Sequence, residues 1–270
     1  MLRIEVRFII LIKIILLLVS FLTLEARPIE SEEIIVVDIT SKDIGLDLKS
    51  QEEYFKNRFH RDAFRLAMAD FLDIAHNKAK FIVIDMWFPD LINLPGEEAL
   101  MKKLKLSTNV TIASGGIYKQ KYEITHPKFA TLVQEMGHIL LNADDPEHLI
   151  FSPTLCGVGT NLPSPKLPCA KHLLQKHIAL LAAEKYLGKE LLFEPGDYVV
   201  MNRENFKPFL RINFSTFKKN PKIIQDKLVI LINRPFPNID MFKIHGKKNI
   251  SGSEILAMMI VFYSVKLPEK

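Results

Sequence analysis

The chain has 270 residues, of which 48% are hydrophobic and 25% are charged, so it can bury a sizeable core. Its formal net charge of +5 is a mild excess, and no basic helix interleaved with aromatic residues accompanies it. This balance excludes a nucleic-acid-binding surface, which needs a concentrated basic footprint.

An apolar stretch lies near the N-terminus. Residues Phe8–Leu24 are apolar except for Lys13 and two small hydroxyl residues, and they follow Arg3 and Arg7. Basic residues ahead of such a stretch hold the N-terminus in the cytoplasm, so the rest of the chain is predicted to be exported. The favoured interpretation is an uncleaved signal anchor, because the stretch is just long enough to span a bilayer. The alternative is a signal peptide that is cleaved after Ala26.

The exported part opens with strands and helices in alternation. The β-branched run Ile34–Asp38 predicts a short buried strand, and the apolar stripe of Arg61–His76 predicts an amphipathic helix after it. Phe81–Asp85 predicts a second buried strand. A short helix at Glu97–Lys105 and a third strand at Asn109–Ser114 complete the series. This order predicts an α/β fold with a mainly parallel (mixed) sheet and helices on both faces.

The later segments are less regular. A stretch rich in Pro, Gly and Ser, residues 144–168, predicts a long excursion from the sheet. Ser251 and Glu254 have the spacing of a capping box ahead of the last helix. Residues 1–27 are therefore predicted to form the leader, and residues 28–270 one extracytoplasmic domain. The further predicted strands are Lys121–Thr125, Gly137–Asn142, Phe209–Phe214 and Lys227–Asn233, and the further predicted helices are Ala170–Leu187 and Ile255–Val265.

The sequence contains two cysteines, Cys156 and Cys169, within the stretch rich in Pro and Gly. In an oxidising compartment such a pair predicts a disulfide, worth about 3 kcal/mol if it acts by restricting the unfolded chain. The alternative is two unpaired thiols, because a single pair offers no spacing pattern that would decide between them.

Nine segments of the exported part form an ordered series. They are VVDITSKDI, RDAFRLAMADFLDIAHNKAKFIVIDMWF, EEALMKKLKLSTNVTIAS, EMGHILLNADD, HIALLAAEKYLG, LRINF, DKLVILIN, NIDMF and GSEILAMMI. Over about residues 30–265 this series resembles the type-two CHASE domain, the cyclase- and histidine-kinase-associated sensory extracellular domain. Each segment alone is a short apolar run with an acid or a glycine, so the order of the nine carries the resemblance.

The resemblance implies a sensory domain that is not an enzyme and needs no cofactor. The apolar stretch Phe8–Leu24 would hold such a domain in the cell (inner) membrane by a single span, with the bulk of the chain periplasmic or extracellular. It would recognise an unknown small ligand. Members of the family usually continue into a fused kinase or cyclase. This sequence contains none, so we expect a separate transducer of the kinase or cyclase type.

Three departures from the family's pattern bear on this expectation. The segment rich in Trp and Pro ahead of the first helix is reduced here to Phe59 and Arg61. After LRINF, Ser215 replaces an arginine, and residues 144–148 replace a turn that contains glycine. A degenerate domain that serves only as a scaffold is therefore an alternative.

Asp38 and Asp85 end two strands that are predicted to be neighbours. In open α/β sheets, ligands bind beyond the carboxyl ends of the strands, and Asp240 follows a late strand at the same edge. Together the three carboxylates could hold a cation or a polar ligand, so an exported metal-dependent hydrolase is the alternative function. Otherwise each acid caps a helix or accepts hydrogen bonds from loop N–H groups.

His138 and Asn213 are candidates for the polar lining of the same edge, although a lone histidine at a strand start is more often a hydrogen-bonded structural residue. His172 and His177 lie about 140° apart around one predicted helix, so they cannot chelate a metal together. The sequence contains no nucleophile elbow, phosphate loop or papain-like cysteine context. We therefore predict no catalytic residue and no resident metal. The predicted ligand-binding residues are Asp38, Asp85, His138, Asn213 and Asp240.

Overall fold

The computed structural model describes most of the chain between residues 27 and 265. The described residues are 27–48, 50–118, 121–139, 148–156, 174–193, 197, 199–202, 209–236, 241–244 and 247–265. The predicted leader Phe8–Leu24, Asp240 and the predicted pairing of Cys156 with Cys169 lie outside this part. Among the described residues, no helix is both long and apolar enough to cross a membrane.

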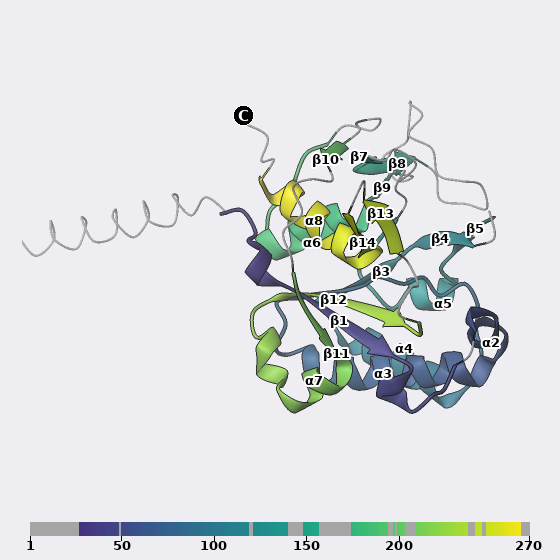
Figure 1. Ribbon diagram of the computed structural model, residues 1–270. Coiled ribbons are helices and arrows are strands. Elements are labelled where there is room, and N and C mark those ends of the chain that lie inside the picture. Colours follow the sequence, from purple (N-terminus) through teal and green to yellow (C-terminus); the bar gives the residue numbers. More distant parts are fainter. Residues whose placement is uncertain are drawn as a thin grey trace, which may run out of the picture.

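Six strands form the central sheet (Figure 1). They are β1 (Ile34–Thr40), β2 (Phe81–Ile84), β3 (Val110–Ala113), β6 (Met136–Gly137), β11 (Leu210–Asn213) and β12 (Leu228–Arg234). Their spatial order is β11-β1-β12-β2-β3-β6, and every neighbouring pair is parallel. The central strands β1 and β12 are buried along almost their whole length, which explains their nearly uninterrupted apolar sequences.

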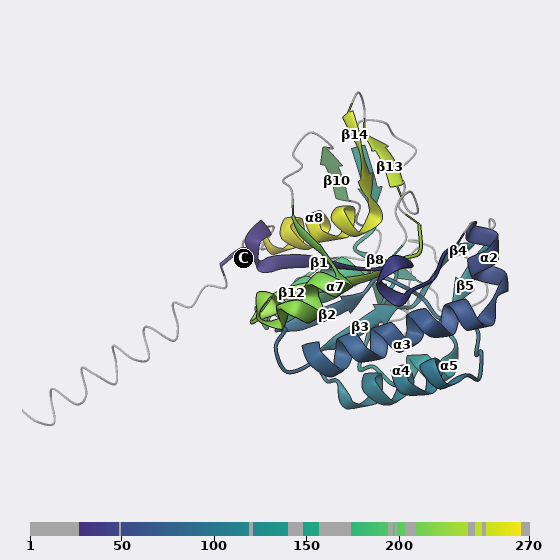
Figure 2. The same ribbon diagram turned by 60° about the horizontal axis from the view of Figure 1, so that its bottom comes forward.

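Helices cover both faces of this sheet (Figure 2). Side chains alternate between the two faces along a strand, so Ile35 and Val37 enter one core while Ile34 and Val36 enter the other. One face carries α3 (Arg58–Ala75), α4 (Pro95–Leu106) and α7 (Phe214–Lys219), and the opposite face carries α6 (Ile178–Leu187) and α8 (Gly252–Val265).

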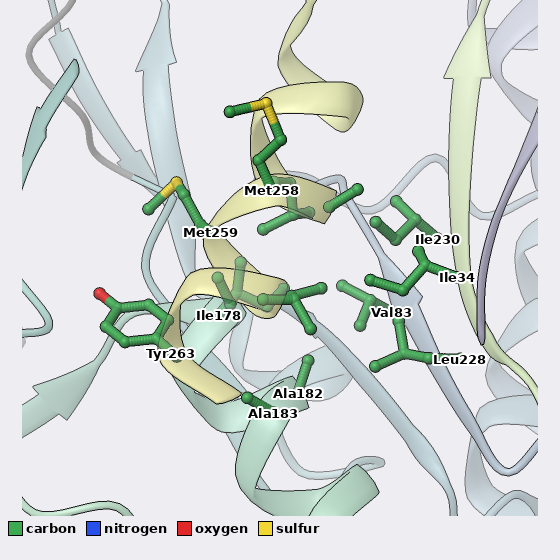
Figure 3. Packing of buried hydrophobic residues seen from close by; sticks show 14 of the residues in the cluster. Ile34, Val83, Ile178, Ala182, Ala183, Leu228, Ile230, Met258, Met259 and Tyr263 are labelled. Carbon is green, nitrogen blue, oxygen red and sulfur yellow. The ribbon is translucent and has the colours of Figure 1, made fainter. Parts of the chain in front are cut away.

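The core beneath α6 and α8 is shown in Figure 3. Ile178 and Ala182 come from α6, and Met259 and Tyr263 come from α8; together with Val83 of β2 they belong to one cluster of buried hydrophobic residues. All five side chains are buried. Both helices are apolar around most of their circumference because each packs against the sheet and against the other helix.

Two-stranded ribbons and short helices lie outside the central sheet. Within the described residues, antiparallel pairing occurs in four separate ribbons and leaves the central sheet parallel. The ribbons pair β4 (Gly115–Tyr118) with β5 (Lys121–Ile124), β7 (His148–Phe151) with β10 (Val199–Asn202), β8 (Thr154–Cys156) with β9 (Leu174–Lys176), and β13 (Met241–Ile244) with β14 (Lys247–Ser251). The short helices are α2 (Gln51–Lys56), α5 (Pro127–Ala130) and the 3-10 turns η1 (Ser31–Glu33), η2 (Lys42–Ile44) and η5 (Pro221–Ile224).

The α/β fold with a mainly parallel sheet is confirmed, but one predicted helix begins too early. The range Ala170–Leu187 was predicted as one helix, whereas Leu174–Lys176 forms strand β9 and helix α6 starts only at Ile178. The helix starts there because His177 caps it: its Nδ1 accepts a hydrogen bond from the Ala179 N–H group at 3.1 Å.

The capping box ahead of the last helix is confirmed. The Ser251 hydroxyl accepts a hydrogen bond from the Glu254 N–H group at 3.3 Å, and the Glu254 carboxylate accepts one from the Ser251 N–H group at 3.0 Å. This reciprocal pair fixes the point at which α8 leaves β14, and it places the start of α8 at the carboxyl edge of the sheet.

Candidate functional site

Four of the predicted site residues lie at the carboxyl edge of the sheet. Asp38 and Asn213 lie near or at the ends of β1 and β11, whereas Asp85 and His138 directly follow β2 and β6. Because all six strands are parallel, these positions share one edge. The strands β11 and β6 are the two outermost ones, however, so Asn213 and His138 are about 24 Å apart at the usual strand spacing. The four residues therefore do not form one pocket.

The prediction that Asp38 and Asp85 end neighbouring strands is wrong. Strand β12 lies between β1 and β2 and pairs with both, which places the backbones of the two aspartates about 10 Å apart. The cause is that β12, which comes late in the sequence, lies between the early strands β1 and β2. No local sequence pattern indicates this order of strands.

Asp38 is held by arginine side chains. Its Oδ2 accepts a hydrogen bond from Arg211 Nε at 2.7 Å, and its Oδ1 accepts one from Arg211 Nη2 at 3.0 Å. Arg234 Nη1 lies 3.5 Å from the same Oδ2. Asp38 is only 6% exposed, so this two-point contact compensates a carboxylate that has little access to water. These partners are arginine side chains, whereas the alternative to ligand binding that we considered was a helix cap or hydrogen bonds from loop N–H groups.

Arg211 joins Asp38 to the start of helix α8. Its Nη1 donates to the Ser251 hydroxyl at 2.7 Å, and its Nη2 donates to the Ser253 hydroxyl at 3.0 Å. The Glu254 carboxylate lies 3.1 Å from Nη1. We call these residues the Arg211 cluster; its members are Asp38, Arg211, Arg234, Ser251, Ser253 and Glu254.

Two members of the Arg211 cluster, Arg211 and Glu254, keep their charges near neutral pH. Burial alone would lower the pKa of Arg211, but Asp38 and Glu254 outweigh it and raise that pKa. Burial alone would also raise the pKa of Glu254, but hydrogen bonds from Ser251 and the charges of the two arginines lower it. Charged side chains of the cluster therefore connect β1, β11 and the start of α8.

Sequence analysis missed Arg211, although the segment LRINF contains it. The signal that could have revealed it is a charged residue at an inward-facing position of a strand, which is costly unless a partner of opposite charge is buried beside it.

Asp85 occupies the loop that follows β2. Its backbone N–H group donates to the Leu231 carbonyl at 3.0 Å, which extends the pairing of β2 with β12 by one residue, and its side chain is half-buried. Among the described residues, no three side chains of His, Cys, Asp or Glu are grouped so that they could hold a metal ion. Among the described residues, Asp38 and Asp85 are therefore not part of a group of three side chains that could hold a metal ion.

Asn213 is the N-cap of α7. Its Oδ1 accepts hydrogen bonds from the Thr216 N–H group at 2.9 Å and from the Ser215 hydroxyl at 3.1 Å. The side chain is thus engaged by the first turn of the helix that it caps.

We predict that Asn213→Ala lowers the free energy of unfolding by about 1 kcal/mol, because the first turn of α7 loses its cap. Urea denaturation measures this loss. The variant Asn213→Asp keeps a capping oxygen and should stay within about 0.5 kcal/mol of the wild type. A loss of similar size in both variants would contradict the capping role.

His138 and His177 form a buried pair between β6 and α6. Their ring centroids are 4.9 Å apart in an edge-to-face arrangement, and the two backbones form a parallel bridge. His138 is fully buried, and neither of its ring nitrogens has a hydrogen-bond partner among the described residues. Burial and the neighbouring His177 hold the pKa of His138 well below its ordinary value, so the imidazole is neutral. His138 therefore belongs to the packed interior.

Gly137 allows this junction to close. A Cβ atom at this position would lie 2.4 Å from Cα and 2.6 Å from the backbone nitrogen of Ile178. We predict that Gly137→Ala costs about 1–3 kcal/mol of stability, because β6 and α6 must separate to admit the methyl group. Thermal unfolding measures the cost. Since the colliding atoms are backbone atoms, adding Ile178→Ala should not restore stability, and a rescue would refute this explanation.

The described residues of the carboxyl edge can bind a charged group through Arg211, and they attach the start of α8 to the sheet. Among them, no three acids or other metal-ligating side chains are grouped for joint catalysis. Comparison with known proteins found no matching family model, no matching curated protein and no matching solved structure.

Proposed function

We propose that the chain is a membrane-anchored extracytoplasmic sensory domain of the CHASE type-two kind, which recognises a small ligand and acts through a separate transducer in the membrane. The observation that carries the proposal is the course of α8, which connects the carboxyl edge of the sheet with the segment that leads into β1. The order of sequence segments that resembles this family supports the same function.

At its start, α8 is attached to the sheet through Ser251, Ser253 and Glu254 of the Arg211 cluster. The helix has 14 residues and is therefore about 21 Å long, comparable to the seven-residue strands beneath it. At its far end, the Ser264 hydroxyl accepts a hydrogen bond from the Ile29 N–H group at 2.9 Å. A single helix thus connects the carboxyl edge of the sheet, the edge at which α/β sheets usually bind ligands, with the segment that leads into β1.

This arrangement suggests how recognition would be transmitted. A polar or anionic ligand at the carboxyl edge would compete with Asp38 or Glu254 for Arg211 and would change how α8 is held. The helix would carry the change to its last turn beside Ile29, where a membrane partner could sense it. Such a mechanism requires that the domain bind the ligand with different affinities when α8 is held by Arg211 and when that contact is released.

Crosslinking in intact membranes tests this proposal. A photoreactive residue placed at Val265, which is 59% exposed at the end of α8, should capture a membrane protein of the transducer type. The matched control is the same residue at Phe59, which is 61% exposed at the start of α3 and should not capture it. Recovery of the protein in the cytosol, or identical adducts at both positions, would overturn the proposal.

The Arg211→Lys variant separates a sensor from a scaffold. Lysine keeps the positive charge but cannot form the two-point contact with Asp38, so the hold on α8 should loosen. A sensor that works through α8 should show an altered yield of the Val265 adduct. A scaffold should give the same yield as the wild type.

A metal-dependent hydrolase would require Asp38 to become a ligand. Its two carboxylate oxygens accept hydrogen bonds from Arg211, so a cation would have to displace this half-buried arginine. No described contact favours that exchange.

A further inference from the structure

Six lysines gather where strands β2 and β12 begin. Residues 76–80 and 214–227 are all described, and they contain six lysines but one acid, Asp226. Two backbone hydrogen bonds bring these segments together: Asp226 N–H donates to the Lys78 carbonyl at 2.8 Å, and Lys80 N–H donates to the Lys227 carbonyl at 2.9 Å. We call this surface the lysine patch; it consists of Lys78, Lys80, Lys218, Lys219, Lys222 and Lys227.

One described acid, Asp226, lies within the lysine patch, and Glu33 adjoins the patch through Tyr186. None of the six takes part in an ion pair between described residues. Lys80 Nζ lies 4.1 Å from the centre of the Tyr186 ring, and Lys218 Nζ lies 4.6 Å from that of the Phe214 ring. Helix C-termini attract basic residues and explain part of the patch, but Lys222 and Lys227 belong to no α-helix.

The lysine patch adjoins the segment that leads into β1. The Tyr186 hydroxyl lies 3.1 Å from a Glu33 carboxylate oxygen and 3.3 Å from the Asp226 carbonyl oxygen, so one side chain touches both regions. Figure 1 shows α7 on the same side of the molecule as this purple leading segment. Only the nine residues from Glu25 to Glu33 separate the apolar stretch from β1. They span at most about 30 Å when fully extended, so an anchored domain carries the patch close to the bilayer.

We infer that the lysine patch docks on anionic phospholipid headgroups of the membrane that holds the leader. The inference rests on the proposed anchoring and adds the surface with which the domain meets the bilayer. Each lysine near an anionic surface strengthens attachment by about fivefold. Docked in this way, the carboxyl edge with the Arg211 cluster points away from the bilayer and stays open to ligands.

Amine footprinting of the full chain in lipid nanodiscs tests the inference. One set of discs contains only zwitterionic phospholipid, and the other contains about one third anionic phospholipid at low salt. An acetylating reagent should modify Lys219 and Lys222 severalfold more slowly in the anionic discs. Lys42 and Lys128, which are exposed at the opposite edge, should react equally in both. Raising the salt to about 1 M should remove the difference, because it shortens the screening length to about 3 Å.

Two matched double variants complete the test. Lys219→Gln/Lys222→Gln should reduce the docking equilibrium by about 25-fold and expose Lys218 to the reagent. Lys42→Gln/Lys128→Gln removes the same charge from the far edge and should leave the protection of Lys218 unchanged. Protein retained in the discs with reactivity that does not depend on the lipid would overturn the lipid-docking surface alone. Protein that is not retained in either kind of disc would overturn the anchor and this inference with it.

Discussion

Replacing Arg211 by methionine is expected to lower the free energy of unfolding by about 3–5 kcal/mol. The substitution removes both hydrogen bonds from a carboxylate that is 6% exposed, and it removes the hydrogen bonds that Arg211 donates to the Ser251 and Ser253 hydroxyls. The contact of Arg234 with Asp38, at 3.5 Å, is too long to replace the lost pair. Urea denaturation of the purified protein measures the loss.

The double variant Arg211→Met/Asp38→Leu provides the decisive comparison. It removes both charges together, and apolar replacements of a buried ion pair are often neutral, so most of the lost stability should return. The exposed Arg58→Met serves as a control for the loss of one arginine and should change stability by about 0.5 kcal/mol or less. The single variant Asp38→Leu completes the comparison. If the stability losses of Arg211→Met and Asp38→Leu simply add up in the double variant, Arg211 and Asp38 do not stabilise the fold as a pair.

Mild acidification is expected to destabilise the protein through His138 and His177. Burial lowers the pKa of His177 to about 3, from 6.5 for the exposed side chain. At a pH between these two values, the unfolded chain binds a proton at His177 that the folded chain does not bind. The contribution of His177 to the free energy of unfolding is therefore complete above pH 6.5 and is lost as the pH falls toward 3. Between about pH 7.5 and about pH 5, His177 alone should cost about 2 kcal/mol. His138, whose pKa is also lowered, acts in the same direction.

Variants of the histidine pair isolate this effect from that of the carboxylates. His177→Asn retains an oxygen that can cap α6 but cannot titrate, and His138→Leu removes the other imidazole. Each variant should show a shallower dependence of unfolding free energy on pH than the wild type, and the double variant the shallowest. The fluorescence of Trp87, the single tryptophan, follows unfolding across the series. An unchanged slope in both single variants would contradict a role for these histidines.

The sequence predicted the buried strands well because their physical signature is local. The ranges Ile34–Asp38, Phe81–Asp85 and Lys227–Asn233 each lie within two residues of an observed strand end. A strand that is covered on both faces must be apolar at consecutive positions, and this pattern is visible without knowledge of its neighbours. The start of α6 was misplaced because its cap is a histidine, which is not among the residues that usually mark a helix N-terminus.

The candidate site was harder to predict because its contacts are long-range. Asp38 and Arg211 are 173 positions apart, and no spacing rule connects residues at that distance. The alternation rule places Asp38 on the same face of the sheet as Ile34 and Val36, but it cannot say whether a ligand, a metal or an arginine will meet the carboxylate there. Only the order of strands in space, with β11 beside β1, supplies that answer.

The position of β12 has a consequence for how the chain reaches its folded state. β1 is among the first residues of the domain to be synthesised, yet both of its sheet partners, β11 and β12, come from the last quarter of the chain. Until residue 234 has been delivered, β1 presents two open edges of free backbone N–H and C=O groups, which invite pairing with other chains. Contacts between such distant segments also form slowly. The nascent chain therefore needs protection from aggregation until β11 and β12 have been synthesised.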